Sequence, residues 1–232
     1  MAEFWFRYRR NRAAVLGLGI LFTILIMAAT AHLFYPEDPF RLVGRPLSGP
    51  LENGFLLGSD SLGRDVASGI VHGAKTSLLI GLIATLVSVF IGIFFGAFAG
   101  YFGGRIDDLL MRITEIFQTI PSFIFAILLV AIMKPSIVSI VIAIAVVSWP
   151  GVARLVRGEF LSLKNREFVQ ACHTLGMSDL RVMMREILPN CLSPIIVIGS
   201  LMVATAILIE SGLAFLGLGD PNIMSWGFQI GA

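Results

Sequence analysis

Long apolar stretches alternate with short charged connections along the whole chain. Five of these stretches contain no charged residue at all. A helix needs about 20 mainly apolar residues to cross the hydrocarbon layer of a membrane, because its backbone amides must be paired within the segment. We therefore predict five transmembrane helices. They cover residues 13–31, 76–104, 116–133, 135–153 and 187–209.

The composition agrees with this pattern. Of the 232 residues, 56% are hydrophobic and 14% are charged, and the mean hydropathy of +0.89 lies far above that of an ordinary water-soluble domain. These values predict an all-α polytopic transmembrane bundle. The net charge of +2 is small and dispersed, which gives no reason to expect a nucleic-acid partner. The two cysteines lack companions at ligand spacing, so we expect no metal site.

The basic residues of the connections predict the orientation. They concentrate in the tail over residues 1–12, in the turn after residue 104 and in the loop over residues 155–188. Basic connections favour the cytoplasmic side, so this tail and loop are predicted to be cytoplasmic and residues 35–75 to lie outside. A cleaved signal peptide also has a basic start and small residues at its end, but the length of the apolar run favours an uncleaved first helix over 13–34.

Glycines and a proline inside the stretches indicate how helices pack. Gly92, Gly96, Gly100 and Gly104 recur every fourth residue, which predicts one bare helix face for close contact with a neighbour. Pro121 removes a backbone hydrogen bond inside the third stretch, so we expect a kink over residues 118–122. Such a kink either lines a passage or only helps packing.

The connection over residues 35–75 changes character along its length. In its second half Leu62, Val66 and Ile70 repeat every fourth residue. This spacing predicts a short amphipathic helix on the outer membrane surface, with Arg64 and Asp65 facing water. The helix either contributes to function or merely covers the bundle.

A charged segment, EFVQACHTLGMSDLRVMMREILPN over residues 167–190, interrupts the apolar stretches. Two apolar sets at helical spacing flank Gly176, which permits a sharp bend, and Ser178 is a suitable N-cap for a second helix. We predict an ordered, bent helical pair that either rests in the headgroups or binds a partner. The two sets are Phe168, Ala171 and Leu175, then Leu180, Met183, Met184 and Ile187.

This segment resembles the "EAA" loop of ATP-binding cassette importers, in which Glu-Ala-Ala is followed by glycine and then by Ile-x-Leu-Pro. Ala171, Gly176, Leu188 and Pro189 keep the positions of that pattern, whereas Gln170, Cys172 and Glu186 depart from it. Two further runs resemble outer stretches of one of the two permease subunits of dipeptide, oligopeptide and nickel importers. They are LGSDSLGRDVASGIVHGAKTSL and ESGLAFLGLGDPNIMSWG.

The resemblance implies a type I importer permease with a core domain over residues 76–232. Members of this type have six spans, so a sixth is expected but absent from this chain. The resemblance also implies a bacterial inner-membrane assembly with a homologous second permease, two cytoplasmic ATPases and an external substrate-binding protein. This sequence contains no GxxxxGK[ST] phosphate loop, so ATP and Mg are expected on the ATPases, and this chain is expected to be neither an enzyme nor a cofactor binder.

The resemblance further implies that a coupling helix near Gly176 sits in a groove of an ATPase. Leu175, Met177 and Leu180 would fill the groove, and polar side chains would lie at its rim. The complete set of expected coupling residues is Gln170, Ala171, His173, Leu175, Gly176, Met177, Ser178, Asp179, Leu180 and Arg181, with Arg185 nearby.

Charged residues also lie at the ends of the apolar stretches. Asp108, Arg112 and Glu115 share a helix face, which favours a structural ladder of charges over a proton path. Glu210 ends an uncharged run and needs water or a partner there.

Two further sets of residues are expected to serve transport itself. The candidate path residues are Gln118, Pro121, Ser122, Ser148 and Trp149, and the candidates for an outer gate or binding-protein contact are Asp60, Arg64, Asp65 and Glu210.

Together these features predict the permease subunit of a binding-protein-dependent peptide importer, with nickel or metal chelates as alternative substrates. An ion-driven carrier would need charges near the middle of the bilayer, which the stretches lack. An intramembrane enzyme would need a motif such as HExxH or GxSG, and none is present. A membrane scaffold or sensor without an ATPase remains open.

Overall fold

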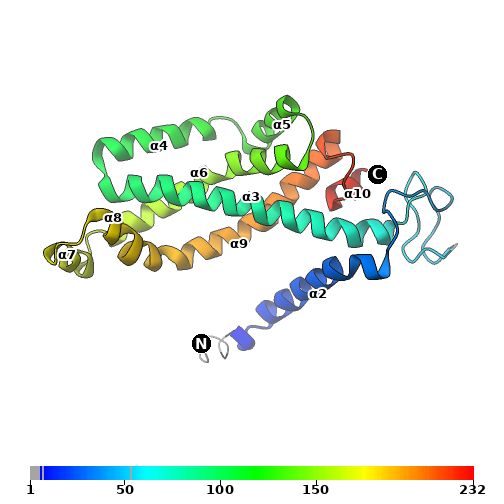
Figure 1. The fold of residues 1–232 in the computed structure, drawn as a ribbon, viewed down its shortest axis with the longest axis horizontal. Helices are drawn as coiled ribbons and strands as arrows, with labels where there is room; N and C mark the ends of the chain where they lie inside the picture. Colours follow the sequence, from blue (N-terminus) through cyan, green and yellow to red (C-terminus); the bar gives the residue numbers. More distant parts are fainter. Residues whose placement is uncertain (1–5, 7, 53) are drawn as a thin grey trace. The chain divides into compact units, whose positions relative to one another are not determined.

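The computed structural model describes residues 6, 8–52 and 54–232, and the regular structure in these ranges is helical (Figure 1). An isolated bridge pairs Ser59 with Asp65. The chain divides into two compact units. The terminal unit comprises residues 1–78 and 221–232, and the bundle unit comprises residues 79–220.

The first predicted span is confirmed as a helix in the terminal unit. Helix α2 (Arg12–Phe34) has 23 residues, which corresponds to about 35 Å and suffices to cross a bilayer. Its start is fixed by Asn11, whose side-chain oxygen accepts hydrogen bonds from the backbone amides of Ala13 and Ala14 at 3.1 and 3.2 Å.

The prediction of a separate short amphipathic helix from Leu62 to Ile70 was wrong. Residues 58–65 form a loop, and helix α3 (Val66–Phe102) then runs for 37 residues without a break. The loop is stabilised by Asp60, whose Oδ1 accepts the backbone amides of Leu62 and Arg64 at 2.9 and 2.8 Å. Such local bonds compete with helix formation, which explains why the helix begins later.

The start of α3 binds the short last helix, α10 (Trp226–Gly231), within the terminal unit. The indole Nε1 of Trp226 donates to the carbonyl of Ile70 at 2.9 Å, and its backbone amide donates to Ser77 Oγ at 3.0 Å. Gly69 and Gly73 leave room for α10, because a Cβ on either would overlap Gln229 or Trp226.

The bundle unit contains the other long helices, and the predicted glycine face of α3 holds two of them together. Helix α6 (Ile137–Leu163) passes so close to α3 that a Cβ on Gly92, Gly96 or Gly100 would overlap its backbone or side chains. Three of the four glycines therefore confirm the predicted contact surface. Gly104 does not, because it begins the next helix with a φ of 51°.

The third predicted span is not one straight helix. Helices α4 (Gly104–Gln118) and α5 (Ser122–Met133) meet at a bend of 79° (Figure 1). The expected kink is confirmed, since Pro121 precedes α5 as its N-cap residue. At 12 residues α5 reaches only about 18 Å, which is too short to cross a bilayer alone, so α5 counts toward a span only as part of the bent pair. The described residues thus provide four spans, or five with this pair.

The last two predicted spans are confirmed as longer helices. Helix α6 extends ten residues past the apolar run to Leu163, and α9 (Leu188–Leu213) begins with Pro189 in its first turn and ends in a π-helical turn, η2 (Ala214–Leu218). Helix α6 is the centre of the unit, because it packs against α4, α5 and α9. The core residues on it include Ile140, Ile144, Val152, Val156 and Phe160.

We predict that Gly96→Ala weakens the contact between α3 and α6. The new Cβ would overlap the backbone carbonyl oxygen of Ala153, which cannot move cheaply. Overpacking of this kind costs about 1–3 kcal/mol, so the melting temperature of the purified protein should fall. Gly158→Ala is the matched control, because Gly158 lies on α6 with nothing within 4 Å of its Cβ position. Equal melting temperatures for the two variants would contradict this packing.

Candidate functional site

The predicted bent helical pair lies at one end of the bundle unit (Figure 1). Helix α7 (Glu167–Thr174) is followed by a turn at Gly176, helix α8 (Asp179–Val182) and a π-helical turn, η1 (Met183–Ile187), that leads into α9. We call residues 164–187 the coupling loop, after the role that the sequence resemblance led us to expect.

The turn at Gly176 closes α7 with a Schellman motif. The amide of Met177 donates to Cys172 O at 3.1 Å, and the amide of Gly176 donates to His173 O at 3.0 Å. This motif places its C′ residue in the left-handed region, and Gly176 has a φ of 75°. The glycine joint expected from the sequence is therefore a defined turn and not a flexible tether.

The inner face of the coupling loop is part of the hydrophobic core. Val169, Val182, Met183 and Ile187 are at most 1% exposed and pack in one cluster with Phe160 of α6. Each buried side chain of this kind stabilises the folded state by about 1.5–3 kcal/mol. The loop is thus fixed to the helices on which it lies.

The outer face of the coupling loop carries two apolar side chains beside the turn. Leu175 is 81% exposed and Leu180 is 61% exposed. Met177, expected with them, is less exposed, since it is half-buried and packs against the core. The Schellman turn explains this difference, since the residue after the left-handed glycine turns back toward the helix.

Tyr101, in the last turn of α3, connects that helix to the coupling loop. Its hydroxyl donates to Asp179 Oδ1 at 2.7 Å and lies 3.4 Å from His173 Nε2. Both partners were expected at the rim of an ATPase groove, but Tyr101 was missed. Its position just after the glycine face of α3 was the only signal in the sequence.

The other expected coupling residues lie on the surface. Ser178 is the N-cap residue of α8, as predicted, although its side chain makes no cap hydrogen bond. Gln170 donates to the carbonyl of Asn165 at 3.3 Å. The remaining members of the set are exposed, namely Ala171, Arg181 and Arg185.

The expected path residues separate into two groups. Gln118, Pro121 and Ser122 are exposed at the bend between α4 and α5, and Ser148 is half-buried. Trp149, in contrast, is buried, with only 4% of its surface exposed. Its ring packs between those of Phe95 and Phe117, with centroids 4.6 and 5.3 Å away.

A charged cavity of about 560 Å³, open to the surface on one side, lies between α4 and α6. Arg157 of α6 binds Asp107 of α4 with two hydrogen bonds of 2.5 and 2.6 Å. The predicted ladder of Asp108, Arg112 and Glu115 is confirmed only for Arg112 and Glu115, which pair at 3.5 Å. The sequence analysis did not identify Asp107 as a functional candidate, because the sequence does not show which side of α4 meets α6. The lining residues are Asp107, Asp108, Met111, Arg112, Thr114, Glu115, Arg154 and Arg157.

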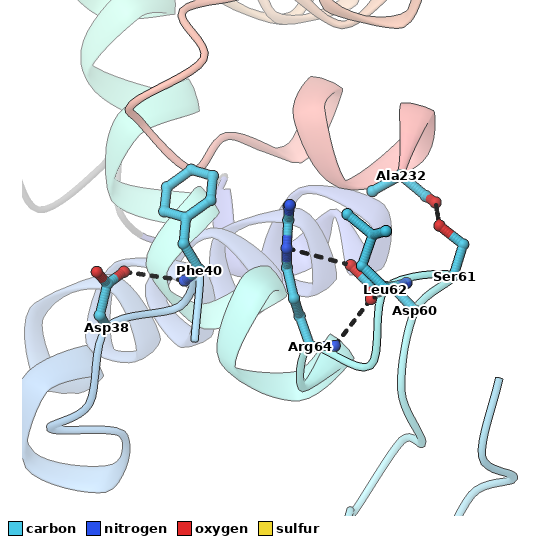
Figure 2. A network of polar contacts seen from close by, with 7 residues as sticks. All are labelled: Asp38, Phe40, Asp60, Ser61, Leu62, Arg64 and Ala232. Carbon is cyan, nitrogen blue, oxygen red and sulfur yellow. Dashed lines mark hydrogen bonds and ion pairs between the residues drawn. The ribbon is translucent and has the colours of Figure 1, made fainter. Parts of the chain in front are cut away.

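The residues expected at an outer gate make contacts within this chain. Figure 2 shows Arg64 beside Asp60, with Nε 3.9 Å from Oδ2. The Arg64 side chain is only 15% exposed, so the expectation that it faces water was wrong. Its guanidinium lies 5.3 and 5.5 Å from the ring centroids of Phe40 and Phe228, a cation–π arrangement that holds the loop against α10.

The other two residues of that set lie at the start of α3 and inside the bundle unit. Asp65 accepts a hydrogen bond from the amide of Ala67 at 2.8 Å at the start of α3. Glu210 is 1% exposed within the bundle unit. A buried carboxylate cannot touch a soluble partner directly, so this geometry argues against Glu210 as a binding-protein contact.

Comparison with known proteins decides the family. Residues 92–230 match the family described as binding-protein-dependent transport system inner membrane component. The chain belongs to this family. Residues 1–47 also match the N-terminal TM domain of oligopeptide transport permease C. The permease predicted from the sequence is confirmed, and with it a multi-pass protein of the inner membrane.

Curated relatives match this permease over nearly its whole length. A di/tripeptide transport system permease protein of Pseudomonas aeruginosa is 39% identical over 99% of this chain and 78% of its own. An oligopeptide transport system permease protein of Escherichia coli is 42% identical over 95% of this chain and 74% of its own. A dipeptide transport system permease protein of Bacillus subtilis is 39% identical over 96% of this chain and 70% of its own.

A solved structure shares the fold of the permease. A chain of the methionine ABC transporter MetNI, in an inward-facing conformation, superimposes with a TM-score of 0.58. The match covers 65% of this chain and 76% of that chain at 16% sequence identity. This likeness confirms the predicted helical architecture of an importer permease.

We predict that Gly176→Ala loosens the coupling loop and that Gly176→Asn does so much less. Alanine at a positive φ costs about 1–2 kcal/mol, whereas asparagine adopts the left-handed region more readily. The Cβ position of Gly176 has no atom within 4 Å, so a clash does not contribute. Hydrogen exchange of the α7 and α8 amides measures the effect, and equal exchange in both variants would show that the turn is not strained.

We predict that Tyr101→Phe and Asp179→Ala loosen the loop through one shared bond. A hydrogen bond to a charged partner contributes about 1.5–3 kcal/mol when shielded and less at an exposed position such as this one. Hydrogen exchange near Asp179 should therefore rise in each single variant and no further in the double variant. Additive increases would mean that the two side chains act separately.

Proposed function

We propose that this chain is a permease subunit of an ATP-driven importer that carries di- and oligopeptides across the bacterial inner membrane. The curated relatives named above, from three bacteria, are permeases for dipeptides, tripeptides or oligopeptides. The tail before α2 and the coupling loop would face the cytoplasm, as their basic residues suggest. A homologous second permease would complete the passage, and an external binding protein would deliver the peptide.

The observation that carries the assignment of the coupling loop is the exposed pair of Leu175 and Leu180. These two large apolar side chains are exposed beside a rigid turn, while the opposite face of the same loop is buried. Exposed apolar side chains on an ordered element are typical of a protein contact. We infer that they enter a groove of a cytoplasmic ATPase subunit, with Arg181 and Arg185 at the polar rim.

The mechanism follows from differential binding. ATP closes a pair of ATPase subunits, and a rigid loop bound to each must move with it. The buried face transmits this movement to α6 and α9, and the bond between Tyr101 and Asp179 transmits it to α3. The spans would then shift between inward-open and outward-open arrangements. This chain supplies the rigid connection, and the ATPases supply the free energy.

We predict that the double variant Leu175→Glu with Leu180→Glu loses the ATPase. Both positions are exposed, so folding should be normal, whereas a charge in an apolar groove costs enough to weaken binding at least about 30-fold, the scale of a hot spot. Co-purification of the ATPase and peptide uptake measure the loss. Ser162→Glu, at an exposed position before the loop, is the control. A double variant that still retains the ATPase would show that the loop only rests on lipid.

A further inference from the structure

The charged cavity between α4 and α6 has the size and the charges to bind a small zwitterion. Its volume of about 560 Å³ lies within the range of about 300–1,000 Å³ that is usual for small-ligand sites. It carries three carboxylates and three guanidinium groups among its lining residues. A cavity of balanced charge does not favour a simple cation or anion.

Most of these charges are already paired within the chain. Arg157 and Asp107 form a bidentate pair, and Arg112 pairs with Glu115. Two lining residues of opposite sign have no ion pair or side-chain hydrogen bond with any described residue. They are the exposed carboxylate of Asp108, which attracts Arg157 only at longer range, and the exposed guanidinium of Arg154.

We propose that this cavity is a peptide-binding station of the translocation path, in which Arg154 binds the terminal carboxylate and Asp108 binds the terminal ammonium. A free peptide carries both groups, whatever its side chains. Guanidinium and carboxylate form bidentate hydrogen bonds, and an ammonium group binds well to a carboxylate. The site therefore recognises the features that all short peptides share.

The surroundings of the two residues suit this role. The bidentate pair of Arg157 and Asp107 fixes α6 against α4, so the cavity has a rigid wall. Gln118, one of the expected path residues, follows Glu115 by three residues and ends α4. Thr114 is 1% exposed and donates to the carbonyl of Leu110 at 2.8 Å, which leaves the charged groups to provide recognition.

This inference rests on the proposed function, because it assumes that peptides are the substrate. The test uses the complete transporter without its binding protein, so that the selectivity of that protein does not enter. Met111→Cys places a thiol in the cavity, in a Cys172→Ala background. Cys191 is 0% exposed, so it should not react with the reagent. The rate of modification by a small charged thiol reagent is then measured with alanyl-phenylalanine present or absent.

The dipeptide should slow the modification, about threefold when it is present at twice its Kd, since protection follows mass action. N-acetyl-alanyl-phenylalanine amide, which lacks both terminal charges, should give no protection. Arg154→Gln and Asp108→Asn should each remove the protection by the free dipeptide. Arg105→Gln is the matched control, because Arg105 is exposed on α4 outside the cavity.

Equal protection by the capped peptide, or unchanged protection in Arg154→Gln, would overturn the assignment. So would the absence of any protection, which would mean that the charges serve contact with the second permease. Binding-protein-dependent uptake of the same dipeptide is measured with the unaltered complex. If uptake is normal while protection is absent, the cavity assignment fails and the proposed function stands. If uptake is absent as well, the proposed function fails.

Discussion

The close contact of α3 with α6 is the constraint on which the bundle unit depends. Gly92, Gly96 and Gly100 allow the two backbones to approach to a distance that no side chain would permit. In a membrane the apolar surroundings provide little drive for helices to associate, so close packing of small residues has to supply it. The same contact aligns the ends of both helices. It brings Tyr101 to the coupling loop and Phe160 beneath it.

The coupling loop is rigid because three different interactions act on it at once. Its buried side chains join the core around Phe160, the Schellman turn fixes the direction of the chain at Gly176, and Asp179 is held from the side by Tyr101. Each interaction alone would leave a short helical pair free to pivot. Together they hold the exposed face of the loop, which includes Leu175 and Leu180, in one arrangement, as a mechanical connection requires.

Much of this fold was predictable because its signals are local. Charge-free runs locate the spans, a four-residue glycine period locates the contact face, and Gly176 marks the turn. What the sequence could not show depends on residues distant in the chain. Arg64 is buried because Phe40 and Phe228 enclose it, Met177 turns inward because the core is there, and Asp107 rather than its neighbour Asp108 meets Arg157 because packing sets the rotation of α4. The resemblance in the loop indicated a coupling role but not which side chains face outward.

The coupling loop and the charged cavity share one turn of α6, which links the two sites physically. A Cβ on Gly100 would meet both the side chain of Phe160, which supports the loop, and the backbone of Arg157, which lines the cavity. A displacement of the loop relative to α3 therefore has to move this turn, because packed cores deform in discrete steps rather than continuously. Such a step changes the position of Arg157 against Asp107, and with it the wall of the cavity. On the two proposals made above, the closing of an ATPase would alter the affinity of the cavity for its ligand through this connection, and by linkage a bound ligand would alter the ease of that closing.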